Sequence, residues 1–431
     1  MHGILLWLGP ASRLLRESVA QGAALPYSFL IGSMTLGISR VTPVEKIREW
    51  HEELTAWRRD FHAHPELGFE EVRTSALVAE RLASWGIEVH RGIGKTGVVG
   101  VLRNGNGQGR LGLRADMDAL PMPEANGFAH KSGIEGKMHG CGHDGHTTML
   151  LATARYLAET RNFDGTVHFI FQPAEEGRGG AQAMLADGLF DRFPCDTVYG
   201  LHNRPGLPIG QFAIRPGPIM AGALFFDILI QGKGGHGARP EQTIDPVVVG
   251  AQIVTALQSV VARNVPALDS AVLSVTGFNA GQAYNVIPDQ VTLKGTVRAF
   301  KMEMMRLVED RMRAVVQGTA AAFGANAEIT FQEIAAPTIN APEEATALGD
   351  AAASLVGEVA VERNRTPVMG SEDFAYMLLQ RPGAYIHVGN GTGDAGGCDV
   401  HNPHYDFNDE AIPYGGGVMA ALVEQKLARV K

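Results

Sequence analysis

The feature that most constrains the fold of this 431-residue chain is a regular alternation of short β-rich runs with longer helical patterns. Residues 98–102 and 111–115 are predicted strands joined by a turn rich in glycine and asparagine. A helix is predicted after Gly145, and residues 167–171 are a further strand. Strands that alternate with helices are typical of an α/β layer with a mainly parallel sheet. The length corresponds to two or three domains at about 100–200 residues each.

The pattern changes between residues 222 and 335. Strand, helix, strand, strand, helix and strand patterns follow one another there, and the two helical stretches cover residues 244–263 and 303–323. This β-α-β-β-α-β order is the ferredoxin-like split motif. The α/β pattern resumes after it. We therefore expect one α/β domain, residues 41–221 and 336–431, interrupted by a compact insert, residues 222–335.

Residues 1–40 are expected to be a disordered extension. Their apolar run, residues 4–8, has no preceding Lys or Arg, and Arg13 and Arg16 follow it closely, so it is a poor signal peptide. Met34 is a candidate for the true start of translation. No run of about 18 apolar residues is apparent in the sequence, so no transmembrane helix is expected and the protein is expected in the cytoplasm.

The net charge narrows the range of binding partners, and the cysteine content indicates the cellular compartment. The chain has 37 Lys and Arg against 46 Asp and Glu, a net charge of −9, and no basic run, which argues against nucleic acid and anionic membranes. Its three cysteines, Cys141, Cys195 and Cys398, are too few for a disulfide framework and point to a reducing compartment. Cys141 lies inside a cluster of histidines.

Four segments carry side chains that bind divalent metals. Residues 139–146 (HGCGHDGH) combine a thiol with imidazoles, which suit zinc or a similar metal. Residues 171–177 (FQPAEEG) bring adjacent carboxylates to a predicted strand end, and His202 and His401 stand in two further segments. Open α/β sheets bind ligands at the carboxyl ends of their strands, where these segments would converge. The four segments together therefore predict a metal site.

Each of these signals is common for purely structural reasons when it occurs alone. A single histidine is often a satisfied core or surface residue, a single cysteine is usually a small buried apolar residue, and adjacent glutamates usually form a solvated face. The joint occurrence, together with Asp116 and Asp118 at another strand end, favours the metal site. On an extended chain Glu175 and Glu176 would point in opposite directions, so one could bind metal while the other acts as acid or base.

Four motifs also carry a resemblance to a known family: residues 114–121 (RADMDALP), 139–146, 171–177 and 370–374 (GSEDF). They are similar to motifs of the aminoacylase/carboxypeptidase G metallohydrolase family, and more narrowly of its hippurate hydrolase and auxin-conjugate amidohydrolase branch. The resemblance covers roughly residues 45–430, in order. It implies a two-metal catalytic α/β domain interrupted by a ferredoxin-like lid that dimerises, in agreement with the division above.

The resemblance also implies roles for particular residues of the α/β domain. Glu175 falls on the catalytic glutamate of the family, and Asp118 on a carboxylate that supports the metal ligands. The implied metal ligands are Cys141, His143, Glu176, His202 and His401.

Three residues of the lid are implied to contact substrate. Residues 234–237 (GGHG) match a motif whose histidine, His236 here, helps to stabilise the reacting carbonyl, often from the partner subunit. Asn285 and Arg298 fall where relatives bind the substrate carboxylate. The alternative for Arg298 is an exposed residue at a strand end.

The chain departs from the wider family in its metal motif. Other branches place a histidine where this chain has Asp116, and bridge the metals with an aspartate near His143. In this chain Cys141 and His143 are implied to bind the metals in place of those residues, as in the narrower branch. Three further histidines could be confused with the ligands and are expected not to bind the metals directly: His139, His146 and His404.

The implied activity is metal-dependent hydrolysis of the amide bond of N-acyl-L-amino acids, with hippurate-like, N-acetyl or similar acyl groups, to a carboxylic acid and an amino acid. Two divalent ions per subunit (Zn, Mn, Co or Ni) and a homodimer formed through the lid are expected. The alternatives in the same family are a dipeptidase and a deacetylase of a biosynthetic intermediate.

Other classes of function fit the sequence less well. A protein stabilised by zinc without catalysis is the non-enzyme alternative, but structural zinc sites usually use four Cys or His ligands, and this set includes carboxylates. A serine hydrolase is disfavoured because no Gly-x-Ser-x-Gly motif occurs. Residues 391–396 fit the Gly-x-Gly-x-x-Gly spacing of dinucleotide-binding proteins, but no helical pattern follows them, so we expect a loop.

Overall fold

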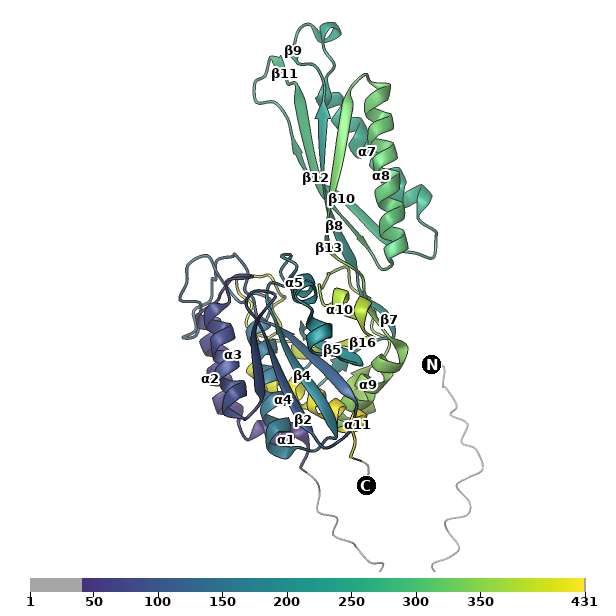
Figure 1. Ribbon diagram of the computed structural model, residues 1–431. Helices are drawn as coiled ribbons and strands as arrows, with labels where there is room; N and C mark the ends of the chain where they lie inside the picture. The colour runs from purple at the N-terminus through teal and green to yellow at the C-terminus, as the bar shows by residue number, and fades with distance from the viewer. Residues whose placement is uncertain (1–40, 430–431) are drawn as a thin grey trace, which may run out of the picture. The chain divides into compact units, whose positions relative to one another are not determined.

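The computed structural model describes residues 41–429 (Figure 1). The predicted extension, residues 1–40 with Met34, lies outside the described residues. The largest sheet has eight strands in the order β1-β2-β4-β3-β5-β16-β6-β15. These strands are β1 (Glu88–Ile93), β2 (Gly97–Asn104), β3 (Arg110–Asp116), β4 (Gly165–Gln172), β5 (Thr197–Pro205), β6 (Phe212–Ala213), β15 (Val361–Glu362) and β16 (Gly383–Gly391).

The central strands β4, β3, β5 and β16 run parallel to one another. Strand β1 pairs antiparallel with β2, β2 with β4, and β6 with β16. Helices cover both faces of this sheet. One face packs against α1 (Pro43–Arg48), α2 (His51–Ala63), α3 (Val72–Ser84), α4 (His143–Thr160), α9 (Pro342–Val356) and α11 (Ile412–Lys426), and the other against α5 (Gly180–Ala186), α6 (Leu189–Arg192) and α10 (Ala375–Gln380). The expected α/β class with a mainly parallel sheet is confirmed.

Residues between 222 and 335 build a second, four-stranded sheet in the order β10-β12-β8-β13, with all pairs antiparallel. Its elements follow one another as β8 (Gly222–Gln231), α7 (Pro246–Asn264), β10 (Ala271–Asn279), β12 (Gln290–Ala299), α8 (Met302–Ala322) and β13 (Asn326–Ala335). The two helices pack with the sheet around a separate hydrophobic core. This is the expected β-α-β-β-α-β order; the bounds and the dimerising role of a lid domain stay a prediction.

The helix α7 bears on the expectation that the chain has no transmembrane helix. Within the described part of the chain it is the one helix that is long and apolar enough to span a membrane, with a mean hydropathy of 1.3. Its buried side chains Ile253, Leu257 and Val260 belong to the core of the four-stranded sheet. A helix that packs on a sheet in this way meets the same criterion, so α7 is weak evidence for a membrane span.

The sequence pattern of residues 42–45 is typical of a helix start and predicts one helix that continues to the turn before Pro65, but the structure has two helices in this segment. Thr42 starts α1 with a capping box, because its hydroxyl accepts a hydrogen bond from the Glu45 N–H while the Glu45 carboxylate accepts one from the Thr42 N–H. The chain leaves the helical conformation at Trp50, which has φ −102° and ψ 12°, and α2 starts after it. The predicted helix is therefore two helices.

The register of the parallel strands brings the polar segments together. Asp116 at the end of β3 pairs with Gln172 at the end of β4, and His202 of β5 pairs with His387 of β16. The side chains at these carboxyl ends therefore meet at one edge of the sheet, as expected for an open α/β fold.

Candidate metal centre and substrate pocket

A tight turn places Cys141 and His143 at the start of α4. Gly142 between them has φ +95°, a left-handed conformation that glycine adopts without steric cost. A Cβ atom at Gly142 would also collide with the Tyr405 hydroxyl and the Asn203 side chain. Both reasons require glycine here, and the turn directs the thiol and the imidazole toward the ends of the central strands.

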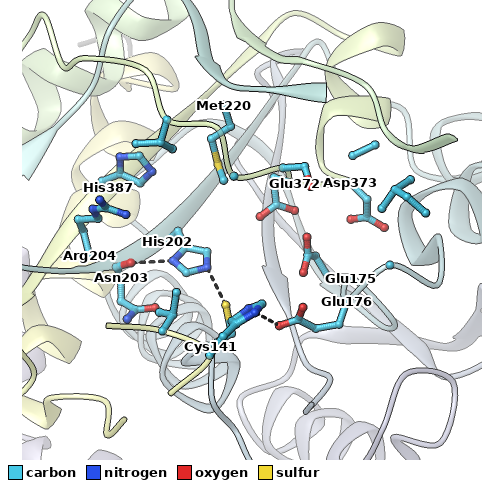
Figure 2. A pocket seen from close by; sticks show the side chains of 18 of the residues that line it. Cys141, Glu175, Glu176, His202, Asn203, Arg204, Met220, Glu372, Asp373 and His387 are labelled. Carbon is cyan, nitrogen blue, oxygen red and sulfur yellow. Dashed lines mark hydrogen bonds and ion pairs between the residues drawn. The ribbon is translucent and has the colours of Figure 1, made fainter. Parts of the chain in front are cut away.

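The expected ligands lie at distances that suit a shared metal site. The Cys141 Sγ lies 3.3 Å from His202 Nε2 (Figure 2), and Glu176 Oε1 lies 3.4 Å from His401 Nε2 and 3.9 Å from His143 Nε2. Two ligand atoms on one tetrahedral zinc ion are about 3.5 Å apart. Among the described residues, five groups of side chains could hold a metal ion, and Cys141 belongs to two of them, one with His143 and His202 and one with Glu176 and His401. The other three groups bring in Asp116, His146, Glu175, Glu372 and Asp373.

Two buried atoms of this cluster have no hydrogen-bond partner among the described residues: His143 Nε2 and Glu176 Oε1. Buried polar atoms are rarely left without a partner, because desolvation then costs free energy that nothing offsets. A cation between them would satisfy both. The thiol, imidazole and carboxylate donors therefore fit one or more divalent metal ions.

Asp118 holds the loop that carries both glutamates. Its carboxylate accepts hydrogen bonds from the backbone N–H groups of Glu175 and Glu176, each at 3.0 Å, and its Oδ1 lies 3.2 Å from His143 Nδ1. Because Nδ1 faces Asp118, Nε2 of the same ring is directed into the site. This geometry agrees with the supporting role expected for Asp118.

The turn after β4 corrects the expectation of an extended chain at Glu175 and Glu176. Residues 175–177 form a turn, and Ala174 before it has φ +54°, an uncommon conformation for a residue with a Cβ atom. The Ala174 N–H donates to Glu71 Oε1 at 2.8 Å, which holds the turn in place. Both glutamate side chains line the same pocket instead of pointing in opposite directions.

The Glu175 carboxylate accepts no hydrogen bond from the described residues, and its Oε2 lies 4.0 Å from His143 Nε2. Burial raises its pKa well above the usual range, and the nearby carboxylates of Glu372 and Glu176 add to this effect. Burial also raises the pKa of Asp373, to about 8; the guanidinium of Arg114 opposes this shift and Glu372 adds to it. A carboxylate that holds a proton readily and faces the pocket suits a role in proton transfer.

A buried arginine neutralises the acids behind the pocket, and its role was not expected from the sequence. Arg114 donates to Asp116 at 2.7 Å, to Glu372 at 2.8 Å and to Asp373 at 3.3 Å, and its Nε donates to Gln172 at 2.9 Å. The signal was present as one charged residue within an apolar predicted strand. The two acids Glu372 and Asp373 belong to the motif 370–374 that carried the family resemblance.

The structure separates His401 from its neighbour His404. His401 has φ +62°, its N–H donates to the Gly140 carbonyl at 2.7 Å, and its ring lines the pocket. His404 does not line the pocket. His401 is therefore the better placed of the two to act as a ligand.

The two other histidines of the motif, His139 and His146, do not line the pocket. His146 is buried, with its Nδ1 2.6 Å from Asp116 Oδ1 and its Nε2 2.7 Å from Asn203 Oδ1, so both ring nitrogens already have partners. Both nitrogens of His139 are buried without a hydrogen-bond partner among the described residues, but this ring does not line the pocket. His146 nevertheless forms a group of potential ligands with Asp116 and His143, so the expectation that it does not bind the metals directly stays a prediction.

The pocket has a volume of about 730 Å³, which is enough for an acylated amino acid. Residues of the α/β fold line it together with residues of the four-stranded sheet, including Phe225 and Arg298. The Arg298 guanidinium lies 5.8 Å from the centre of the Phe225 ring and donates to the Thr296 hydroxyl and the Val297 carbonyl. It has no carboxylate partner among the described residues, so it is free to bind one.

His236 and Asn285 lie together but outside this pocket. His236 is in β9 (Gly235–His236), which pairs with β11 (Val286–Ile287), and the Gly237 N–H donates to the Asn285 carbonyl at 2.8 Å. Both residues are exposed, and neither is among the residues that line the pocket with Arg298. Their action on a substrate, from a partner subunit, stays a prediction.

Comparison with known proteins identifies the family. The model of peptidase family M20/M25/M40 matches residues 112–425. The chain belongs to this family. It is 42% identical to hippurate hydrolase from Campylobacter jejuni over 379 residues, which is 88% of this chain and 98% of that protein. It is 41% identical to IAA-amino acid hydrolase ILR1-like 2 from Arabidopsis thaliana over 375 residues, 86% of this chain and 84% of that protein.

The fold is also similar to a solved structure of the family. The YxeP protein of Bacillus subtilis, described as a dinuclear metal-binding peptidase of the M20 family, superposes with a TM-score of 0.76 and 34% sequence identity. The alignment covers 88% of this chain and 99% of that chain. The sequence resemblance and the α/β fold are thereby confirmed, and the divalent metal expected from the donor set agrees with this relative.

Proposed function

We propose that the protein is a metal-dependent amidohydrolase that cleaves N-acyl-L-amino acids to a carboxylic acid and an amino acid. The observation that carries this proposal is Glu175, a largely buried carboxylate without a hydrogen bond from the described residues, beside a set of thiol, imidazole and carboxylate donors in a pocket of suitable size. Similarity to a hippurate hydrolase and to an IAA-amino acid hydrolase supports the substrate class.

Two divalent ions per subunit would be held by the five ligands that the donor distances support. When bound, such ions lower the pKa of a water molecule and polarise the substrate carbonyl. Zn, Mn, Co and Ni are the candidates, because the mixed set of imidazole, thiolate and carboxylate ligands suits divalent transition metals of this series. The proposed ligands are Cys141, His143, Glu176, His202 and His401.

Glu175 acts as the general base and then as the general acid. Its carboxylate accepts a proton from the water whose oxygen attacks the amide carbon. As the carbon–nitrogen bond breaks, Glu175 gives this proton to the leaving nitrogen, so the products are a carboxylic acid and an amine. Asp118 keeps the Glu175 carboxylate in position through the backbone of the turn.

Arg298 binds the free carboxylate of the amino acid, so acylated amino acids should be preferred over plain amides. His236 and Asn285 would reach the same substrate from a second subunit in a homodimer, where His236 donates a hydrogen bond to the developing oxyanion. The three cysteines are free, which is compatible with the cytoplasm as the proposed location.

The test uses protein stripped of metal, with Zn, Mn, Co and Ni added back separately. The substrates are N-benzoylglycine, N-acetyl amino acids, indole-acyl conjugates and simple dipeptides. Metal-dependent release of an amino acid from the acyl substrates supports the proposal. Activity on dipeptides alone would make the protein a dipeptidase, and bound metal without any hydrolysis would favour a zinc-stabilised protein that is not an enzyme.

A further inference from the structure

A second arginine in the pocket has no assigned role. Arg204, near the end of β5, lines the same cavity as Arg298. The structure gives the Arg204 side chain no hydrogen bond or ion pair with any described residue, and its Nε is buried without a partner. The charge of Arg365 also lowers the pKa of the nearby His387, but Arg365 itself forms an ion pair with Glu362 at 2.9 Å. An unpaired guanidinium in a cavity is costly to keep and gains free energy when an anion binds.

The sheet register places a buried histidine beside this arginine. Strands β5 and β16 are parallel, with His387 paired to His202 and Gly389 paired to Arg204. Alternate residues of a strand share a face, so His202, Arg204 and His387 project from the same side of the sheet. Figure 2 shows Arg204 and His387 next to each other in the pocket wall. Gly389 adds no side chain between them.

His387 is 3% exposed, and its Nδ1 has no hydrogen-bond partner among the described residues. Burial lowers the pKa of His387 to about 3, and the positive charges of Arg204 and Arg365 add to this effect. The imidazole can donate an N–H to an anion whether it is neutral or protonated. The acids of the pocket, Glu175, Glu176, Glu372 and Asp373, lie on the other side of His202 in Figure 2.

We propose that Arg204 and His387 form a second carboxylate subsite, so that the preferred substrates are N-acyl amino acids with a carboxylate in addition to the one at Arg298. The guanidinium binds this carboxylate through two N–H groups, and the imidazole donates a third hydrogen bond. The extra carboxylate belongs either to an acidic amino-acid side chain or to a dicarboxylic acyl group. This inference rests on the proposed hydrolysis of acylated amino acids.

The experiment compares kcat/KM of the metal-loaded protein for matched acid and neutral substrates. One pair is N-acetylglutamate and N-acetylglutamine, and the other is N-succinylleucine and its succinyl methyl ester. We expect the acid to be favoured at least about tenfold in one pair, and that pair identifies the source of the carboxylate. No preference in either pair would overturn the subsite. N-benzoylglycine, which has one carboxylate, tests the proposed function separately, since its hydrolysis without any acid preference would refute only the subsite.

Two variants and a control locate the contact. Arg204→Gln should reduce the acid-to-neutral ratio at least about tenfold, whereas Arg204→Lys keeps the charge and part of the ratio. Arg365→Gln removes a nearby positive charge that does not line the pocket, and it should change the ratio less than about threefold. An equal effect of Arg365→Gln and Arg204→Gln would overturn direct contact. In Arg204→Glu, the preference should change from substrates with an additional carboxylate to N-acyl-lysine, provided that circular dichroism shows a folded protein.

Discussion

Replacement of Asp118 by Asn tests whether one carboxylate positions both the metal ligand Glu176 and the base Glu175. The wild-type carboxylate accepts two backbone N–H groups at 3.0 Å and faces His143 Nδ1 at 3.2 Å. The amide has one acceptor oxygen, so one N–H loses its partner and the other donates to a neutral group. A hydrogen bond to a charged group contributes about 1.5–3 kcal/mol and a neutral one about half of that, so the variant loses about 3 kcal/mol.

The lost free energy should appear partly as a lower free energy of unfolding and partly as weaker metal binding. We expect the dissociation constant for Zn²⁺ to rise about 10–100-fold, which corresponds to about 1.4–2.8 kcal/mol, because groups behind metal ligands have effects of this size. The measurement is competition with a chromophoric chelator, together with urea unfolding of the metal-free protein. Asp289→Asn is the matched control, since its carboxylate accepts the Gly234 N–H at 2.8 Å away from the pocket. Wild-type metal affinity and wild-type hydrolysis in Asp118→Asn would refute the reasoning.

Three further predictions concern the site and the core. Glu175→Gln should keep its metal content, measured by elemental analysis, but lose at least about a thousandfold in kcat; near-normal turnover would exclude Glu175 as the base. Gly142→Ala should lower the melting temperature and the metal content together, because of its φ of +95° and the collision with Tyr405, and an unchanged melting curve would contradict this. Burial lowers the pKa of His168 to about 4, and the charge of Arg103 adds to this effect. In the folded protein His168 is therefore neutral above about pH 4. The unfolded chain takes up a proton below about pH 6.5, so stability should fall by up to about 3 kcal/mol as the pH drops from about 6.5 to about 4. In urea unfolding, the free energy of unfolding of His168→Gln should fall less steeply with decreasing pH than that of the wild type. An equal dependence on pH in the two proteins would refute the assignment.

The strands and helices were largely predictable because their signals are local. The apolar run at residues 167–171 became β4, and the helical pattern at 303–323 became α8. The turn at Glu175 was not predictable in this way. Its shape depends on the left-handed conformation of Ala174 and on a hydrogen bond to Glu71, which is 103 residues away along the chain.

The candidate ligands were predictable as residue types, because a thiol, imidazoles and carboxylates rarely gather in short motifs for structural reasons alone. Their supporting groups were not predictable. Arg114 meets Glu372 across a sequence separation of 258 residues, and Arg204 meets His387 only through the pairing of β5 with β16. Such contacts are set by the topology of the sheet, which a single sequence does not display residue by residue.

The position of β16 has a consequence for how the protein matures. This strand lies between β5 and β6, yet it is synthesised after the entire four-stranded sheet and its helices. During translation the central sheet therefore has an open gap, while β8 to β13 can already pair with one another. His401 follows β16, so the proposed ligand set is also incomplete until this late segment emerges. Contacts between distant segments form slowly, and metal capture should thus be among the last steps after the ribosome has made both halves of the domain.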